Sequence, residues 1–137
     1  MRMSTDRLAR QMGTGLIGMG VAHFVVPKPF DGIVPKEIPA DARTLTYASG
    51  VAEIGLGAGL LAPRTRRLAA ALSVLLFIAV YPANVNMVRL WWDKPLAYKI
   101  IALGRLPFQF PMIWAALKVY RAETAKQRGL TAQRSPR

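Results

Sequence analysis

Glu53 is the residue of this chain whose type and position most clearly indicate chemistry. It lies within a long apolar segment, about nine residues after Thr44, which corresponds to roughly 14 Å along a helix axis. A carboxylate in an apolar medium is costly, so it must be paired, protonated or turned toward an internal cavity. Arg105 is the best candidate partner for this carboxylate, and His23 is the second.

Other polar side chains are expected at a similar depth. His23 lies near the end of the first apolar segment, and Asn84 and Asn86 lie near the end of the third. Arg105 and Gln109 are four residues apart at the start of the fourth, which puts them on one helix face. If successive segments run in opposite directions, all of these residues fall in one half of the protein. The sequence therefore predicts a ligand-handling or proton-handling cluster of His23, Glu53, Asn84, Arg105 and Gln109.

Three interpretations of Glu53 remain open at this point. The carboxylate can form an internal ion pair that fixes the register of the helices. It can serve a ligand site or a proton-handling site, for which Ser49 and Gly57 on the same helix face leave space. It can also face a partner subunit.

The composition excludes several classes of protein. The chain has no cysteine, so disulfides, thiolate metal sites and thiol redox chemistry are absent from it. With one histidine and seven acidic residues, a metal site is not expected. The net charge of +12 invites a nucleic-acid interpretation. Most Lys and Arg residues, however, lie between or beyond the apolar segments, as in membrane proteins, and we expect no nucleic-acid partner.

The glycines of the chain indicate helix packing rather than cofactor binding. Gly13–Gly18 matches the dinucleotide fingerprint G-x-G-x-x-G, but that motif functions only between a strand and a helix. Here it lies inside an apolar segment. Gly55 and Gly59 have the small-x-x-x-small spacing that lets membrane helices approach closely.

Four apolar segments must position the polar cluster, and they lie at about 8–26, 45–62, 68–88 and 106–120. A hydrocarbon core of about 30 Å requires roughly 20 helical residues, which three segments reach and the fourth approaches. The expected fold is an all-α membrane protein, an up-down-up-down bundle of four transmembrane helices formed by residues 1–128. The proline-rich loop 27–42 is predicted to be neither helix nor strand, and residues 129–137 a disordered basic tail.

The distribution of basic residues predicts the topology. Twelve of the 19 Lys and Arg residues lie in the N-terminal segment, in the turn Pro63–Arg67 and in the tail from Lys118. The side of the membrane with more Lys and Arg is cytoplasmic. We therefore expect a multi-pass protein of the inner (plasma) membrane with both termini in the cytoplasm, so that the polar cluster lies in the outer half.

Five short pieces, taken in order, resemble the DoxX-like family of small four-helix membrane proteins. They are His23-Phe24 with Pro29-Phe30 and Ile33–Pro35, Ser49–Glu53, Pro63–Arg67, Tyr81–Asn84 and Arg105–Gln109. The family takes its name from a small subunit of an archaeal thiosulfate:quinone oxidoreductase, and other members are linked to redox partners. The resemblance implies a four-helix membrane bundle, with Glu53, Arg105 and Gln109 at an internal polar site.

These observations lead to two functional hypotheses. In the first, the chain is a redox-associated membrane subunit or a protein that binds a quinone or another lipophile, with a quinone-type ligand in the polar cluster. In the alternative, it is a structural or assembly subunit without catalytic activity, whose glycine-rich faces pack against a membrane protein partner or a second copy. A third hypothesis, a small-molecule permease, has less support, because four helices enclose little space. No reaction is assigned.

Overall fold

The computed structural model describes residues 4–134, and every regular element in that range is an α-helix. The helices are α1 (Thr5–Val25), α2 (Pro27–Asp31), α3 (Ala42–Leu61), α4 (Arg66–Ala79), α5 (Tyr81–Leu90) and α6 (Leu96–Arg134). The all-α class is as predicted.

The first three apolar segments become α1, α3 and the pair α4–α5. Ser4 caps α1 by accepting a hydrogen bond from the Arg7 backbone, and Asp41 caps α3 in the same way at Thr44. The third segment is interrupted once, at Val80, and Pro82 follows in the first turn of α5. A proline is tolerated there because a first-turn N–H has no partner within its own helix.

α6 extends well beyond the predicted range of 106–120 in both directions. It begins at Leu96, and it continues through Pro107 and Pro111 without a break. Residues 129–134, predicted to be disordered, form its last turns, while residues 135–137 of the predicted tail lie outside the described residues. The charges that end the apolar stretch do not end the helix, because Lys and Arg are good helix formers.

The proline-rich loop also contains one unpredicted element, the five-residue helix α2. Its prolines, Pro27 and Pro29, lie in the first turn, where the fixed φ angle of proline suits a helix. The prediction of a wholly irregular loop was therefore wrong for residues 27–31. It agrees with the structure for Pro35, which lies in irregular backbone, and for Pro39, which lies in a bend.

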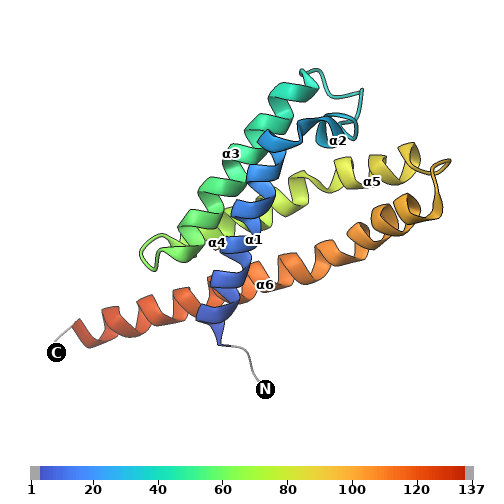
Figure 1. The fold of residues 1–137 in the computed structure, drawn as a ribbon. Helices are drawn as coiled ribbons and strands as arrows, with labels where there is room; N and C mark the ends of the chain where they lie inside the picture. The colour runs from blue at the N-terminus through green and yellow to red at the C-terminus, as the bar shows by residue number, and fades with distance from the viewer. Residues whose placement is uncertain (1–3, 135–137) are drawn as a thin grey trace.

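The helices form two antiparallel pairs (Figure 1): α1 lies against α3, and α6 lies against α4 and α5. The pairs approach each other where the first turns of α1 cross α6, and they diverge toward α2 and α5. Around the first α1 turns, Leu8 and Met12 share a buried apolar cluster with Leu60 of α3 and Val119 of α6. A smaller cluster of Ile33, Met87 and Ala102 lies at the opposite end.

Glycines bring the backbones of α1 and α3 into direct contact, as their number in the sequence predicted. A Cβ atom added to Gly13 would lie 2.7 Å from the Gly57 carbonyl oxygen. A Cβ on Gly20 would likewise lie 2.7 Å from the Gly50 carbonyl oxygen. The predicted Gly55–Gly59 pair acts differently: Gly59 packs on Ala69 of α4, and Gly55 faces open space.

Two helical stretches in the described part of the chain are long and apolar enough to cross a membrane. They are Arg66–Leu90, which joins α4 and α5, and Leu96–Arg134, which is α6. Less than a third of the most apolar window of each stretch is buried within the protein. Most residues of these windows are therefore not buried within the protein, and large apolar side chains such as Leu68, Leu75 and Phe108 are exposed.

Candidate functional site

Four of the five predicted site residues line one cavity of about 200 Å³, where the two helix pairs diverge. His23 comes from α1, Glu53 from α3, Asn84 from α5 and Arg105 from α6. α2 and the following loop cover the cavity with apolar side chains, including Phe30, Ile33 and Ile38. Polar groups from four helices thus meet inside a mainly apolar shell.

The side-chain partner of Glu53 within ion-pairing distance is His23. The His23 Nε2 atom lies 3.8 Å from Glu53 Oε1, and both side chains are about nine-tenths buried. The other ring nitrogen, Nδ1, is 2.8 Å from the Met19 carbonyl oxygen and must carry a proton to donate to it. The His23 ring also stacks on Phe30, with centroids 3.8 Å apart. The ring is held so that Nε2 faces the carboxylate, and a proton between them can reside on either group.

Buried oxygens without a hydrogen-bond partner gather around this cavity. Within residues 4–134 there are three such side-chain oxygens: Glu53 Oε2, Thr46 Oγ1 and Asp31 Oδ1. Glu53 and Thr46 line the cavity themselves. Asp31 ends α2, which covers the cavity, and its second oxygen accepts a hydrogen bond of 2.7 Å from Arg43. Thr46 and Asp31 lie close enough to partner each other, since a hydrogen bond from Thr46 is the main cause that lowers the pKa of the Asp31 carboxyl below its ordinary value. Glu53 Oε2 has no such partner, and because buried polar groups are normally paired, it indicates a site that a ligand or water can fill.

Arg105 does not pair with Glu53, which differs from the sequence-based expectation. Among the described residues, no acidic oxygen lies within 4.0 Å of the Arg105 guanidinium. Its half-buried side chain lines the cavity on the side of α6. The guanidinium group carries five N–H donors, and none of them is paired with an acidic side chain of the described residues. The cavity therefore contains a cation on one wall and the Glu53–His23 pair on another.

Gln109, the fifth predicted residue, lies behind the cavity and supports it. Its side-chain amide donates to the Phe77 carbonyl in the last turn of α4, and its oxygen accepts from Asn84 Nδ2 at 3.1 Å. All of these groups are buried. Gln109 therefore supplies a hydrogen-bond donor to a carbonyl in the last turn of α4, next to the interruption at Val80, and it orients the Asn84 side chain.

Asn86 also has a supporting position. Its amide donates to the Ile33 carbonyl at 3.0 Å, and its oxygen accepts from Arg89 at 2.6 Å. This contact fastens the loop after α2 onto α5. Asn86 is thus a positioning residue for the cavity cover rather than part of its lining.

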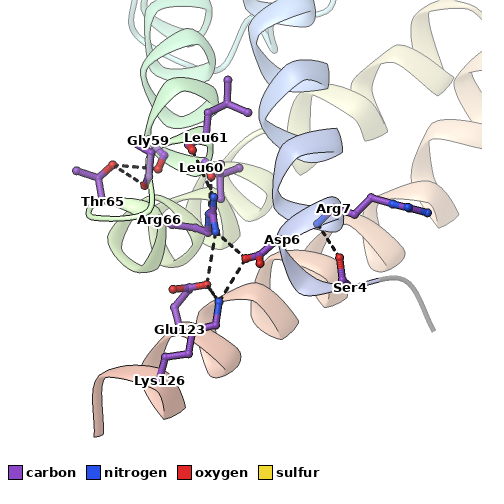
Figure 2. Close-up of polar contacts among 11 residues, drawn as sticks. Ser4, Asp6, Arg7, Gly59, Leu60, Leu61, Thr65, Arg66, Glu123 and Lys126 are labelled. Carbon is purple, nitrogen blue, oxygen red and sulfur yellow. Dashed lines mark hydrogen bonds and ion pairs between the residues drawn. The ribbon is translucent and has the colours of Figure 1, made fainter. Parts of the chain in front are cut away.

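A second polar cluster lies at the opposite end of the bundle (Figure 2). Arg66 is only 5% exposed. Its guanidinium donates to the carbonyls of Leu60 and Leu61 at 2.8 and 3.3 Å and to Asp6 at 2.8 Å. Glu123 of α6 lies 3.8 Å away. One arginine thereby connects α1, α3, α4 and α6.

Lys126 completes this cluster and lowers the pKa of Asp6. Its ammonium donates to Glu123 at 2.9 Å and to Asp6 at 3.3 Å. The hydrogen bond and charge of Lys126, together with the charge of Arg66, lower the pKa of Asp6 below its ordinary 3.8. The hydrogen bond to Glu123, followed by that to Asp6, raises the pKa of Lys126 above its ordinary 10.5. Two acids and two bases therefore form one network of ion pairs at this end of the bundle.

The sequence contained a signal for Arg66 that was interpreted only as topology. A helix leaves its last carbonyls without partners, and a basic side chain just beyond the end can bind them. Thr65 and Arg66 follow α3 closely, and Thr65 also donates to the Gly59 carbonyl, at 3.0 Å. The packing of the other helices decides that Arg66, rather than Arg64 or Arg67, turns inward, and the local sequence does not show this.

The cavity and the Arg66 cluster allow different chemistry. The cavity offers hydrogen-bond acceptors, a cation and a histidine–carboxylate pair that can hold one proton. The Arg66 cluster has its donors and acceptors matched. Within the described residues, no group of three or more His, Asp or Glu side chains could hold a metal ion.

Comparison with known proteins gives one family match. A family model described as a domain of unknown function, DUF8561, matches residues 12–120. This range includes the whole cavity and excludes Asp6, Glu123 and Lys126 of the Arg66 cluster. Neither the curated proteins nor the solved structures gave a match.

Proposed function

The chain belongs to the family of domains of unknown function DUF8561, and we propose that it is a four-helix membrane protein that binds a lipophile with a polar ring head group. The observation that carries this proposal is the buried Glu53 carboxylate, with one oxygen unpartnered, at a cavity of about 200 Å³. A quinone or quinol is the ligand type that matches these groups best.

The outward-facing apolar side chains support four membrane spans. Large apolar residues are exposed on all the long helices, including Val25 of α1, Val51 of α3, Leu75 of α4 and Phe108 of α6. A water-soluble monomer rarely exposes a continuous apolar surface of this kind.

Two tryptophan–lysine pairs, whose lysines lie on α6, support the same placement. Lys99 lies 5.4 Å from the Trp92 ring centroid, and Lys118 lies 4.9 Å from that of Trp114. Tryptophan and lysine concentrate at membrane interfaces. The two lysines are separated by 19 residues, or about 28 Å of helix, close to the thickness of a hydrocarbon core of about 30 Å.

The charge distribution supports an orientation with both termini in the cytoplasm. The N-terminal segment, the Pro63–Arg67 turn and the end of α6 carry the basic excess, and Arg66 joins all three regions. The cavity lies at the other end, so this orientation puts it in the outer half of an inner (plasma) membrane.

The size of the cavity favours one ring rather than a whole lipophile. An engineered cavity of about 150 Å³ holds a benzene molecule, so about 200 Å³ holds one substituted ring. A quinone carbonyl would accept from Arg105 or Asn84, and a quinol hydroxyl would donate to the free oxygen of Glu53. His23 would then exchange a proton with Glu53. Electrons would have to come from a membrane redox partner, because this chain has no dithiol pair.

A redox-associated subunit is the role that the DoxX-like resemblance favours, and that resemblance remains a prediction. The alternative role, a structural or assembly subunit, is favoured by a separate observation. A Cβ atom added to Gly15, Gly18 or Gly55 would meet nothing within 4 Å. These glycines leave a flat outer face on α1 and α3 to which a helix of a partner protein or a second copy could pack.

Binding of a short-chain quinone tests the proposal. The quinone is used in its reduced form, decylubiquinol, whose hydroxyl can donate to Glu53; it is titrated without oxygen into the purified protein in uncharged detergent, and binding is followed by calorimetry. Glu53→Gln removes the charge with little change of shape and should weaken binding roughly tenfold to a hundredfold, the value of a charge-assisted hydrogen bond. Ser49→Leu, which fills the cavity without changing charge, should also reduce binding.

The matched control is Glu37→Gln, since the Glu37 side chain is 70% exposed and lies outside the cavity lining. It should bind the quinone as the unchanged protein does. Equal binding by the Glu53 and Glu37 variants would contradict the ligand proposal. Loss of the folded Glu53 variant, with no quinone binding by the unchanged protein, would favour the structural role.

A further inference from the structure

Positive charge exceeds negative charge at the end of the bundle that holds the Arg66 cluster. The two acids there, Asp6 and Glu123, are both engaged by Arg66 and Lys126. Several exposed arginines at the same end have no acidic group within 4.0 Å among residues 4–134: Arg7, Arg10, Arg64, Arg67, Arg121 and Arg128. Their charges are available to an external anion.

Two of these arginines line one groove although they come from different helices. Arg67 of α4 and Arg128 of α6 border a groove of about 570 Å³, together with Tyr120 and Gln127. No acidic residue contributes to its lining. The hydroxyl of Thr124, also in the lining, already donates to the Tyr120 carbonyl at 2.9 Å. The donors left for a ligand are therefore chiefly the two guanidinium groups.

The groove lies directly beyond the apolar surface of the bundle. On α4, Leu68 follows Arg67 at once and is 63% exposed, and the exposed Leu72 and Leu75 continue this surface. On α6, the Trp114–Lys118 pair marks the end of the apolar surface, and the last turns extend past the other helices (Figure 1). In the membrane placement proposed above, the groove lies at the depth of the lipid head groups.

We infer that this groove binds the phosphate head group of an anionic phospholipid. Guanidinium groups from two helices would each offer paired donors to phosphate oxygens, a geometry that lysine cannot provide. The acyl chains of the same molecule would lie along Leu68, Leu72 and Leu75. A free phosphate would satisfy the arginines but not the adjoining apolar surface, so the lipid is the better fit. This site is separate from the cavity at Glu53 and shares with it only the membrane placement.

The test uses the full chain in uncharged detergent and dioctanoyl phosphatidylglycerol as the probe, with binding measured by calorimetry. Arg67→Gln/Arg128→Gln should weaken binding roughly thirtyfold, about fivefold for the paired hydrogen bonds lost with each arginine. Arg67→Lys/Arg128→Lys retains the charges but removes the paired donors, and it should weaken binding by several-fold. The Lys variant provides the test if the Gln variant does not fold.

The matched control is Arg10→Gln/Arg64→Gln, which removes the same charge at the same end but outside the groove. Its affinity should fall no more than about threefold. An equal loss in both Gln variants would overturn the proposal, because diffuse surface charge would then explain binding. Equal binding of dioctanoyl phosphatidylcholine would overturn it as well. Displacement of the lipid by inorganic phosphate at matching concentration would identify a free-anion site instead.

Discussion

Removal of the Arg66 side chain is the most direct test of how this bundle is held together. Arg66→Met preserves much of the length and apolar volume of the stem but deletes every donor of the guanidinium. The carbonyls of Leu60 and Leu61 would then lose their side-chain donor, and Glu123 would lose one of its two basic neighbours. Buried groups that lose their partners carry their full desolvation cost.

The contacts of Arg66 indicate which loss dominates. Asp6 is about half exposed, so its ion pair contributes at most about 1 kcal/mol after solvent screening. The two carbonyl hydrogen bonds involve a charged donor, and each is worth about 1.5–3 kcal/mol. We therefore expect Arg66→Met to lower the free energy of unfolding by about 3–5 kcal/mol, and Asp6→Asn by about 1 kcal/mol or less.

The assay is reversible unfolding in mixed micelles, in which the anionic detergent fraction is raised and helicity is followed by circular dichroism. Arg64→Met is the matched control, since Arg64 is exposed in the same turn and has no ion pair among the described residues. It should change the free energy of unfolding by no more than about 0.5 kcal/mol. An Arg66 variant as stable as the Arg64 variant would refute the reasoning. A loss at Asp6 equal to that at Arg66 would show that the ion pair dominates instead of the carbonyls.

Three further predictions concern packing, the cavity support and pH. Gly57→Ala puts a Cβ atom 2.5 Å from a backbone oxygen of α1 and should cost about 1–3 kcal/mol, whereas Gly55→Ala, in open space, should be neutral or stabilising by thermal unfolding. Gln109→Leu leaves a buried carbonyl and a buried amide unpaired, so it should lower the unfolding free energy by about 1–3 kcal/mol and weaken quinone binding. The pKa of Asp6 is lowered by folding, so its contribution to stability is present above pH 3.8 and is lost as pH falls through the lower folded value. The pKa of Lys126 is raised, so its contribution to stability is present below pH 10.5 and is lost as pH rises through the higher folded value. When the free energy of unfolding is measured against pH, Asp6→Asn should remove the acid step and Lys126→Met the alkaline step, and a step that persists would contradict its assignment.

The sequence predicted how far along each helix the polar residues lie. Apolar length and helix rise were enough to put His23, Glu53, Asn84 and Arg105 at one end, and these four residues do line one cavity. This worked because depth along an axis depends only on residue counts. The same counting also located the glycines that bring α1 against α3.

Lateral pairing could not be predicted in the same way. Arg105 was the preferred partner of Glu53, but His23 is the group within ion-pairing distance, because rotation and spacing of the helices decide which side chain reaches the carboxylate. Gln109 was predicted to be in the site and instead supports it through Asn84. Arg66 was missed because a run of basic residues does not reveal which member turns inward.

The arrangement of contacts along α1 has a mechanical consequence. Asp6 is fastened to Arg66 and Lys126 at one end, and His23 lies 17 residues away at the cavity, about 26 Å along the axis. The backbone contact between α1 and α3 holds these two helices together as one rigid unit, and Glu53 lies on the α3 part of that unit. A rotation of about 3° about the fastened end would move His23 by about 1.3 Å relative to Arg105 on α6, over that helical rise. A small tilt at the arginine end would therefore change the width of the cavity by about the radius of a water molecule, without any helix having to bend or unwind.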